Sequence, residues 1–400
     1  MRERRRLTMT VLFLILICVP LLVHIAGNPP LMPFSENRTK AASPGIPQSL
    51  AGIQSFPMLY DTYLHDNFGL RNTLISINSW MKWRLHMQFM PFIIRGQSDW
   101  LFLGDHIDKT MTQCLGMYTL NEKDMALWIK GVAKIKRWIE NRGMKFFLSI
   151  MPNKCRVYEE LIPRAFRKRL GPTPLEQIKE YLNKESLDIG LVDPIKPMMN
   201  AKGKDDIYYK LDEHWNNIGA YASYKHLMSL IKPSYPEMSV LEEDDFNVLY
   251  HSYGMSGQAT LISLSKYLHE YAPVLELKHP SHVTFNAKSD ILWDSAPSWV
   301  YNVTNNTEAP KLLSYYDSAL TEMFTPLRET FYKSIFLQRY LNRFDARVVE
   351  TLKPDVVLVS MAERLVAMHI LYKAPLFCYD IKSCERETGI DELIDLDAMH

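Results

Sequence analysis

Short apolar segments that alternate with amphipathic ones constrain the fold of this chain more than any other feature. Met144–Met151 is almost continuously apolar and ends at Pro152, and similar runs occur at Lys311–Tyr316 and Pro354–Ser360. Runs of this length suit strands that are buried on both faces of a parallel sheet. Amphipathic stretches such as Asn121–Arg142 lie between them, with apolar residues at helical spacing. The alternation predicts an α/β fold, a three-layer α/β/α sandwich with a mainly parallel sheet.

The remaining elements follow from the same patterns. We expect further helices at Leu50–Gln88 (with a break at Asp66–Arg71), Thr173–Lys184, Asn216–Leu230, Leu320–Tyr332 and Phe344–Thr351. We expect further strands at Arg95–Gly104, Ile189–Asp193, Ser334–Leu337 and Leu376–Tyr379. Residues 232–310 show little periodicity, so we interpret them as a long irregular insertion at the surface. Long irregular loops in compact domains often carry function.

The N-terminus predicts a membrane-spanning segment. Arg2–Arg6 is basic, and Leu7–Gly27 contains no formally charged residue. About 20 apolar residues span a bilayer as a helix, and the basic flank predicts a cytoplasmic N-terminus. An uncleaved signal-anchor is the favoured interpretation, and a cleaved signal peptide is the alternative. We therefore predict a basic tip and anchor over 1–27, a Pro- and Ser-rich linker over 28–49, and an exported domain over 50–400.

Composition excludes some functions and limits others. The 400 residues carry a formal net charge of +1, which gives no reason to expect binding to nucleic acid. Cys18 lies in the apolar segment, and four cysteines remain for the exported part. Four cysteines allow three pairings, of which we expect Cys114–Cys155 and Cys378–Cys384. Their spacing does not resemble a zinc site, so no metal and no cofactor is expected.

Asp212 and His214 form the first candidate for chemistry. They stand two residues apart, after a predicted short strand at Asp206–Lys210 and just before a predicted helix. In an extended segment residues i and i+2 point to the same side, so the carboxylate can orient the imidazole. The imidazole then serves as a general base through its other nitrogen. The alternative is a helix-capping region with a surface histidine.

Ser318 is the candidate nucleophile. It stands between the predicted strand Lys311–Tyr316 and the helix that follows, which places it at the carboxyl edge of the sheet, where ligands usually bind. Backbone N–H groups at the start of that helix can stabilise an oxyanion. The alternative is that Asp317-Ser318 only caps the helix, as such residues often do.

Several motifs together resemble the SGNH-hydrolase-like alginate O-acetyltransferases, the AlgJ/AlgX type, and the related DHHW proteins. The resemblance rests on Asp212–Asn216 (Asp-Glu-His-Trp-Asn), Tyr316–Ala319 (Tyr-Asp-Ser-Ala), Asp66–Arg71, Asp99–Phe102, and Lys353–Val357 followed by Glu363-Arg364. In that family the Asp/His pair precedes the serine, as it does here. The resemblance implies a flavodoxin-like SGNH domain with permuted motif order, which spans nearly all of the exported part.

The resemblance also implies residue roles. Ser318 matches the nucleophile, His214 the general base and Asp212 the residue that orients the histidine. Tyr316 stands where the SGNH motif has glycine, and Tyr316 and Trp215 are candidates for sugar contact, with core packing as the alternative for Trp215. The Ser318 backbone N–H is the expected oxyanion donor. Arg364 is a candidate electrostatic contributor to substrate binding, and an ion pair with a neighbouring carboxylate is its alternative.

Three functions fit these features. The resemblance implies a membrane-anchored O-acetyltransferase that modifies an exported polysaccharide, with a multi-spanning membrane acyltransferase as the partner that supplies acetyl groups. A carbohydrate or lipid esterase with the same triad is the second possibility, because water can replace the sugar hydroxyl. A non-catalytic scaffold subunit of a polysaccharide export or modification complex is the third.

Overall fold

The computed structural model describes residues 2–26, 39–167, 171–253, 257–285, 299–338 and 346–371. The chain divides into two compact units, Met1–Ile93 with Gly254–His269 and Ile94–Tyr253 with Glu270–His400. The second unit contains the central sheet and every site residue considered above. The domain boundaries expected from the sequence, 1–27, 28–49 and 50–400, stay a prediction.

The described part of the first unit contains four helices joined by irregular segments. Its helices are α1 (Arg2–Ile25), α2 (Leu50–Asn67), α3 (Arg71–Arg84) and α10 (Gly257–Leu261). Within α1, Arg4–Ile25 is long and apolar enough to cross a membrane by length and composition. The predicted break between α2 and α3 is confirmed, and Leu70 there adopts a left-handed conformation with φ 65°.

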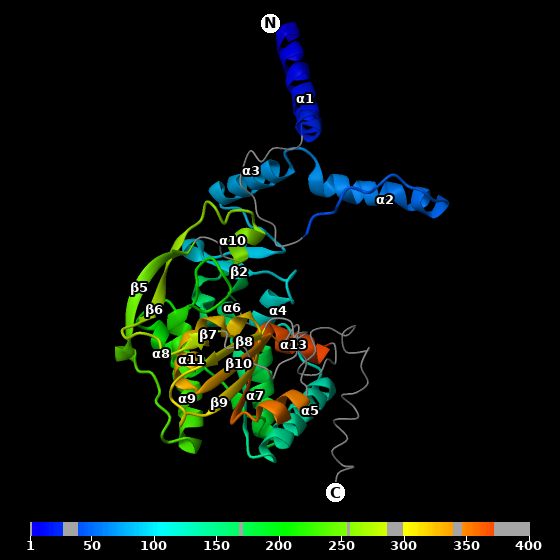
Figure 1. The fold of residues 1–400 in the computed structure, drawn as a ribbon. Coiled ribbons are helices and arrows are strands. Elements are labelled where there is room, and N and C mark those ends of the chain that lie inside the picture. The colour runs from blue at the N-terminus through cyan, green and yellow to red at the C-terminus, as the bar shows by residue number, and fades with distance from the viewer. Residues whose placement is uncertain are drawn as a thin grey trace. The chain divides into compact units, whose positions relative to one another are not determined.

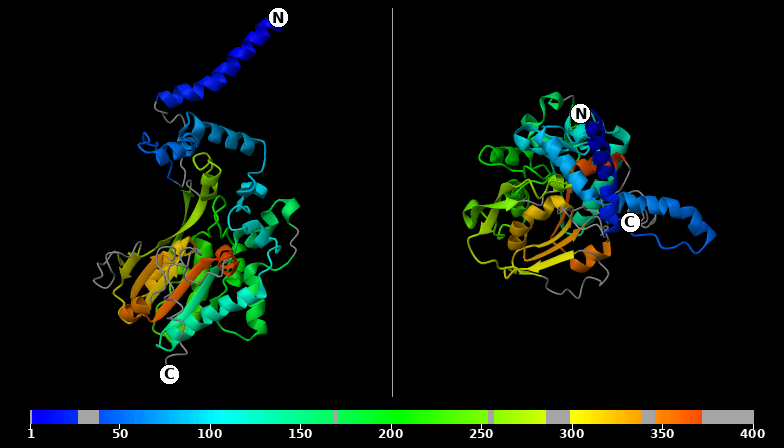
Figure 2. Two further views of the ribbon diagram at one scale, coloured as in Figure 1. Left: turned by 90° about the vertical axis from the view of Figure 1, so that its right-hand side faces the viewer. Right: turned by 90° about the horizontal axis from the view of Figure 1, so that it is seen from above.

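A seven-stranded sheet forms the centre of the second unit, in the order β4-β3-β11-β9-β10-β8-β7. Its strands are β3 (Lys145–Met151), β4 (Leu191–Val192), β7 (Thr284–Phe285), β8 (Trp299–Val303), β9 (Lys311–Tyr316), β10 (Lys333–Gln338) and β11 (Val356–Ala362). The five strands from β4 to β10 in this order are parallel, and β8 and β7 join antiparallel at one edge. In Figure 2 the yellow-to-orange strands β9, β10 and β11 lie side by side.

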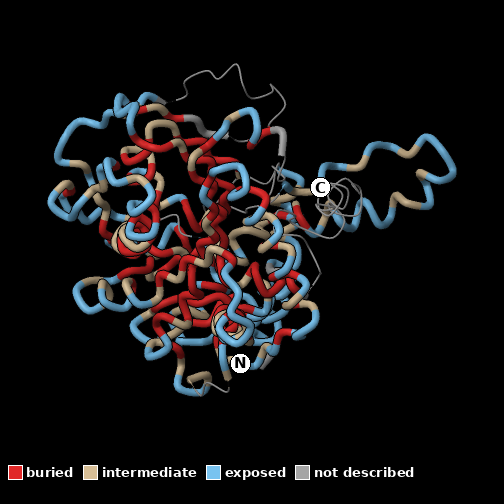
Figure 3. Tube along the Cα trace, turned by 90° about the horizontal axis from the view of Figure 1, so that it is seen from below, coloured by how far each residue is buried: buried red, intermediate tan, exposed pale blue. Residues whose placement is uncertain are grey.

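Helices pack on both faces of this sheet (Figure 1). One group that packs together consists of α5 (Glu122–Glu140), α7 (Pro174–Lys184) and α13 (Glu363–Leu371), and the other consists of α8 (Ile195–Lys202), α9 (Asn217–Ile231) and α11 (Phe324–Thr330). The sheet between them is the core. All seven residues of β11 are buried, and in Figure 3 the red, buried stretches of the chain gather in the middle of the domain. The predicted three-layer α/β/α architecture is confirmed.

The stretch that we expected to be irregular contains strands. Strands β5 (Phe246–Tyr253) and β6 (Glu270–Leu277) pair antiparallel as a two-stranded ribbon, while β7 and β8 extend the central sheet. Six consecutive residues of β5, from Asn247 to Ser252, are exposed. Because neither face of that segment is buried, its sequence lacks the alternation that identifies a strand.

Shorter elements complete the described part of the chain. They are β1 (Ile93–Arg95), η1 (Gln97–Asp99), β2 (Leu101–Leu103), α4 (Thr110–Cys114), α6 (Lys154–Val157), η2 (Glu159–Leu161), η3 (Arg164–Phe166), η4 (Lys232–Ser234), η5 (Glu243–Asp245), η6 (Ser318–Met323) and α12 (Ala346–Leu352). The expected pairing of Cys114 with Cys155 is present and joins α4 to α6. Cys378, Cys384 and the predicted strand Leu376–Tyr379 lie outside the described residues.

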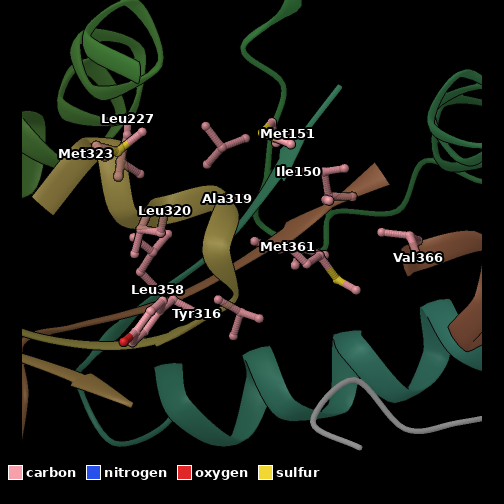
Figure 4. Packing of buried hydrophobic residues seen from close by; sticks show 14 of the residues in the cluster. Ile150, Met151, Leu227, Tyr316, Ala319, Leu320, Met323, Leu358, Met361 and Val366 are labelled. Atoms are coloured by element: carbon pink, nitrogen blue, oxygen red, sulfur yellow. The ribbon is translucent and has the colours of Figure 1, made fainter. Parts of the chain in front are cut away.

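The helix expected at Leu320–Tyr332 is divided in two. A 3₁₀ segment, η6, runs from Ser318 to Met323, and α11 follows it. Pro326 explains the division, because proline has no N–H to give to an i−4 carbonyl and is tolerated only in the first turn of an α-helix. Leu320 and Met323 of η6 are fully buried among the core residues shown in Figure 4. The turn that carries Ser318 is therefore anchored to the core.

Candidate active site

The turn after β9 presents Ser318 at the carboxyl ends of the parallel strands. Asp317 precedes it in an extended conformation and caps η6, with Oδ1 accepting the Ala319 N–H at 2.9 Å. Its other oxygen, Oδ2, accepts the Ala362 N–H at 2.9 Å and so ties the end of β9 to the end of β11. The capping interpretation is therefore correct for Asp317, and the Ser318 hydroxyl is left to another partner.

That partner is His214. The His214 Nε2 atom lies 2.8 Å from Ser318 Oγ, and Nδ1 lies 2.6 Å from Asp212 Oδ1. An ionised carboxylate only accepts hydrogen bonds, so Nδ1 carries the proton and Nε2 is free to accept one from the serine hydroxyl. Asp212 is buried, whereas the His214 side chain is 29% exposed. The geometry is that of a nucleophile, a base and an orienting acid.

The local backbone around His214 differs from the expected strand. Only a single β-bridge forms, between Tyr208 and Trp215, and residues 210–214 make a bend. Asp212 Oδ1 also accepts the His214 backbone N–H at 3.1 Å, which closes the bend. The carboxylate and the imidazole are thus brought together by a side-chain-to-backbone turn. The alternation of an extended strand, which we had expected to do this, is absent.

Two charged side chains hold the backbone of this bend, one through its carbonyl groups and one through its N–H groups. Lys154, which is fully buried, donates from Nζ to the carbonyl oxygens of Leu101 at 2.6 Å, Lys210 at 3.0 Å and Asp212 at 2.8 Å. The Glu270 carboxylate accepts the N–H groups of Lys210 at 2.5 Å and Leu211 at 2.9 Å. Burial lowers the pKa of Lys154 to about 8, although nearby carboxylates oppose this shift. Asp212 therefore sits on a backbone held by one buried and one half-buried charged side chain.

Sequence reasoning missed both residues. A lysine directly after a buried strand, in Pro152-Asn153-Lys154, was the available signal for Lys154, because a charge at that place must find partners. Glu270 gave no signal, since it lies in a stretch that we expected to be irregular. Its position depends on the pairing of β5 with β6, in which Glu270 is opposite Tyr253.

Replacing Lys154 by methionine is expected to reduce both stability and activity. Three buried carbonyls would lose their donor, so we expect the free energy of unfolding to fall by roughly 3–5 kcal/mol, as when one partner of a buried charged group is removed. In the fraction that remains folded, kcat should fall by roughly 10²-fold, because a catalytic group displaced by about 1 Å costs that much. Urea unfolding and ester turnover at low temperature measure the two effects.

Lys225→Met is the matched control. Lys225 makes a surface ion pair with Glu242, with Nζ 2.5 Å from Oε1. Exposed pairs contribute about 0–1 kcal/mol, so this variant should unfold and react nearly as the natural protein does. If Lys154→Met behaved like this control, the buried lysine would not support the triad.

The electrostatics of His214 favour its role as a base near neutral pH. Burial lowers the pKa of His214, but the hydrogen bond and charge of Asp212 outweigh burial, so the pKa is raised above the ordinary 6.5. Arg364 acts on the same imidazole in the lowering direction. Burial also raises the pKa of Glu213, which lies between Asp212 and His214 in the sequence.

The three residues expected to contact substrate have other environments. Trp215 is 0% exposed, so its assignment as a sugar contact is corrected to core packing, the alternative considered above. Tyr316 is 8% exposed and packs edge-on against Phe324 and Phe336, so most of its ring lies in the core. Arg364 forms the expected ion pair, with Nε 3.3 Å from Asp108 Oδ2.

Comparison with known proteins agrees with this fold. Residues 93–295 match the family described as "SGNH hydrolase-like domain, acetyltransferase AlgX". The curated relatives include "Probable alginate O-acetylase AlgJ" of Pseudomonas syringae pv. tomato, 24% identical over 176 residues, which are 44% of this chain and 42% of that protein. The matched stretch thus spans about two-fifths of the length of that relative.

Solved structures show the same fold at low sequence identity. A DHHW family protein from Eubacterium siraeum has a TM-score of 0.50 at 14% identity, over 70% of this chain and 98% of that one. Bacillus cereus PatB1, determined with a sulfonyl adduct, has a TM-score of 0.50 at 15% identity, over 70% of this chain and 95% of that one. The second unit is therefore an SGNH-like α/β domain. The chain belongs to the AlgX-type family of SGNH hydrolase-like acetyltransferase domains.

Proposed function

We propose that this protein is a membrane-anchored O-acetyltransferase that transfers acetyl groups to hydroxyls of an exported polysaccharide. The observation that carries the proposal is the contact of His214 Nε2 with Ser318 Oγ at 2.8 Å, with Asp212 on the other ring nitrogen. Membership in the acetyltransferase family supports acyl transfer as the reaction class. The name of the AlgJ relative, an alginate O-acetylase, supports a polysaccharide as the acceptor.

In the first half-reaction the serine accepts the acetyl group. His214 Nε2 takes the Ser318 hydroxyl proton while Oγ attacks the carbonyl carbon of an acetyl ester. The Ser318 backbone N–H stabilises the oxyanion, since the first N–H groups of a helix have no intrahelical partner and the Ala319 N–H is used by Asp317. The tetrahedral intermediate then collapses, the leaving alcohol departs with the proton from His214, and acetyl-Ser318 remains.

In the second half-reaction the acceptor replaces the leaving alcohol. His214 removes the proton from a sugar hydroxyl, whose oxygen attacks the acetyl-serine carbonyl. Collapse of this intermediate returns the proton from His214 to Ser318 Oγ and releases the acetylated sugar. Asp212 keeps the imidazole in the required tautomer and stabilises the imidazolium in both halves. If water attacked instead, the same residues would act as an esterase.

Helix α1 is the basis for proposing a membrane anchor. Its segment Arg4–Ile25 suits a single membrane span, and the basic residues before it favour a cytoplasmic N-terminus with the second unit outside. The acetyl donor would then have to reach the extracytoplasmic side. We propose that a membrane-bound acyltransferase supplies it.

Acetyl transfer by the full chain in detergent or nanodiscs tests the proposal. The donor is p-nitrophenyl acetate, and the acceptors are a neutral oligosaccharide, cellopentaose, and an anionic one, a mannuronate pentamer. We expect acetylated sugar to form faster than free acetate with at least one acceptor. Hydrolysis that is indifferent to sugar would favour an esterase, and failure to turn over the donor would favour a non-catalytic scaffold.

A further inference from the structure

Two aromatic side chains that we had not expected to contact sugar, those of Tyr209 and Tyr253, stack on each other near the bend that contains His214. Tyr209 donates its backbone N–H to the His214 carbonyl at 3.1 Å, next to the bridge between Tyr208 and Trp215. Tyr209 and His214 are thus directly opposite each other across this bridge. This hydrogen bond brings the backbones of Tyr209 and His214 together at the base of the bend.

The Tyr209 side chain is held in place. It is buried, and its hydroxyl is hydrogen-bonded to Glu322, which stands four residues after Ser318 in η6. Glu322 Oε2 also accepts a hydrogen bond from Asn217 Nδ2 at 2.5 Å. Burial raises the pKa of the Glu322 carboxyl group, and the charge of His214 opposes this effect. A ring with so little freedom is a firm support for whatever packs on it.

Tyr253 packs on this support. It ends β5, and its ring stacks on that of Tyr209 with centroids 4.5 Å apart and planes 13° from parallel. Opposite Tyr253 in the ribbon is Glu270, whose carboxylate holds the bend that contains Asp212. Burial raises the pKa of Tyr253 to about 12, with further contributions from Asp212, Glu322 and Glu270. This face of the ribbon is therefore directed at the triad.

The stack has one supported face and one side that reaches solvent. Tyr209 is 4% exposed, whereas Tyr253 is only partly buried. An aromatic ring combines a large, rigid apolar surface with a polar tip, which suits a ligand that is apolar on its faces and polar at its edges. A pyranose ring has this character, since its C–H groups lie on its faces and its hydroxyl groups project from its edge.

We propose that Tyr253, supported by Tyr209, is the platform on which a sugar ring of the acceptor stacks, with its acceptor hydroxyl directed at His214. The inference deepens the proposed acetyl transfer and rests on it. It assigns to the acceptor a binding site beside the candidate triad, with the carboxyl groups of Asp212, Glu322 and Glu270 in its surroundings. The proposed ligand of the platform is a pyranose ring within an oligosaccharide or polysaccharide chain.

Binding and transfer assays on the full chain test the platform. In the Ser318→Ala background, isothermal titration with cellopentaose and with the mannuronate pentamer measures binding without turnover. We expect Tyr253→Ala to weaken binding of the preferred oligosaccharide by about tenfold, equivalent to about 1.4 kcal/mol. Tyr253→Phe keeps the ring face and should bind within about twofold of its parent. With Ser318 present, Tyr253→Ala should lower transfer to sugar far more than hydrolysis of p-nitrophenyl acetate.

Tyr271→Ala is the matched control. Tyr271 is opposite Ser252 in the same ribbon, is 76% exposed, and lies on the face away from Tyr253 because neighbouring residues of a strand alternate. It should bind and transfer as its parent does. The platform is overturned if Tyr253→Ala binds both oligosaccharides normally, or if transfer and hydrolysis fall together. If the natural protein bound sugar normally but transferred no acetyl group to it, the proposed acetyl transfer would be contradicted. The binding measurements on Tyr253→Ala would still test the platform.

Discussion

Replacing Ser318 by alanine is expected to reduce acetyl transfer and ester hydrolysis on the order of 10⁴-fold or more, because the variant has no oxygen nucleophile for His214 to activate. The fold should be nearly unchanged, since Asp317 makes the capping hydrogen bonds of this turn and the Ser318 hydroxyl does not. Turnover of p-nitrophenyl acetate and thermal unfolding measure the two effects. The loss of activity should therefore occur without loss of stability.

Covalent labelling tests Ser318 as the nucleophile independently of turnover. A sulfonyl fluoride should add one sulfonyl group to the natural protein, on Ser318, and none to Ser318→Ala, as intact mass and peptide mapping will show. Ser229→Ala is the control, because Ser229 is an exposed serine of α9 whose hydroxyl only donates to the His226 carbonyl. Acetyl transfer that survives in Ser318→Ala would mean that Ser318 is not the nucleophile.

Replacing Asp212 by asparagine is expected to lower kcat by roughly 10³–10⁴-fold, the effect of losing the acid that fixes the histidine tautomer. An amide at this position can donate to Nδ1, which would place the imidazole proton on Nε2. The protonated Nε2 could then not accept the proton of the Ser318 hydroxyl. The size of the side chain is conserved, so the bend should persist. Steady-state kinetics over a range of pH measure the effect.

The same variant should shift the pH dependence of kcat/KM. His214 acts as a base only when neutral, and its pKa is raised above 6.5 because Asp212 outweighs burial. Activity of the natural protein should therefore fall as the pH drops through a midpoint above 6.5. Without the Asp212 charge burial dominates, so the midpoint of the variant should move to lower pH. Asp244→Asn, an exposed position in η5, should leave the profile unchanged. An unshifted midpoint in Asp212→Asn would mean that another group limits the rate.

Much of the fold was predictable because strand and helix patterns are local. Buried parallel strands require continuous apolar runs, and Met144–Met151 and Pro354–Ser360 correspond closely to β3 and β11. The ribbon β5–β6 was not predictable in this way, since its first strand is exposed on both faces and shows no alternation. The 3₁₀ geometry of η6 was also not predicted, although Pro326 indicated that one continuous helix would not form.

The candidate site was predictable only in part. Ser318, His214 and Asp212 were recognisable because each stands in a short motif at the end or start of an element. Trp215 and Tyr316, the aromatic candidates for sugar contact, are both buried in the core, since an aromatic residue beside a motif fits the core as well as a ligand. Tyr209 and Tyr253 were missed, because their stacking joins the bend before α9 to a ribbon strand that the pattern did not reveal.

The amino-acid sequence by itself determined where strands, helices and the apolar N-terminal segment lie, because these depend on the order of neighbouring side chains. Only the tertiary structure decided that His214 meets Ser318 across 104 residues, and that Lys154 and Glu270 hold the backbone around Asp212. Those contacts depend on which strands are neighbours in the sheet and on how the bend is held against them. Strand order is set by the packing of the whole domain, and no local pattern contains it.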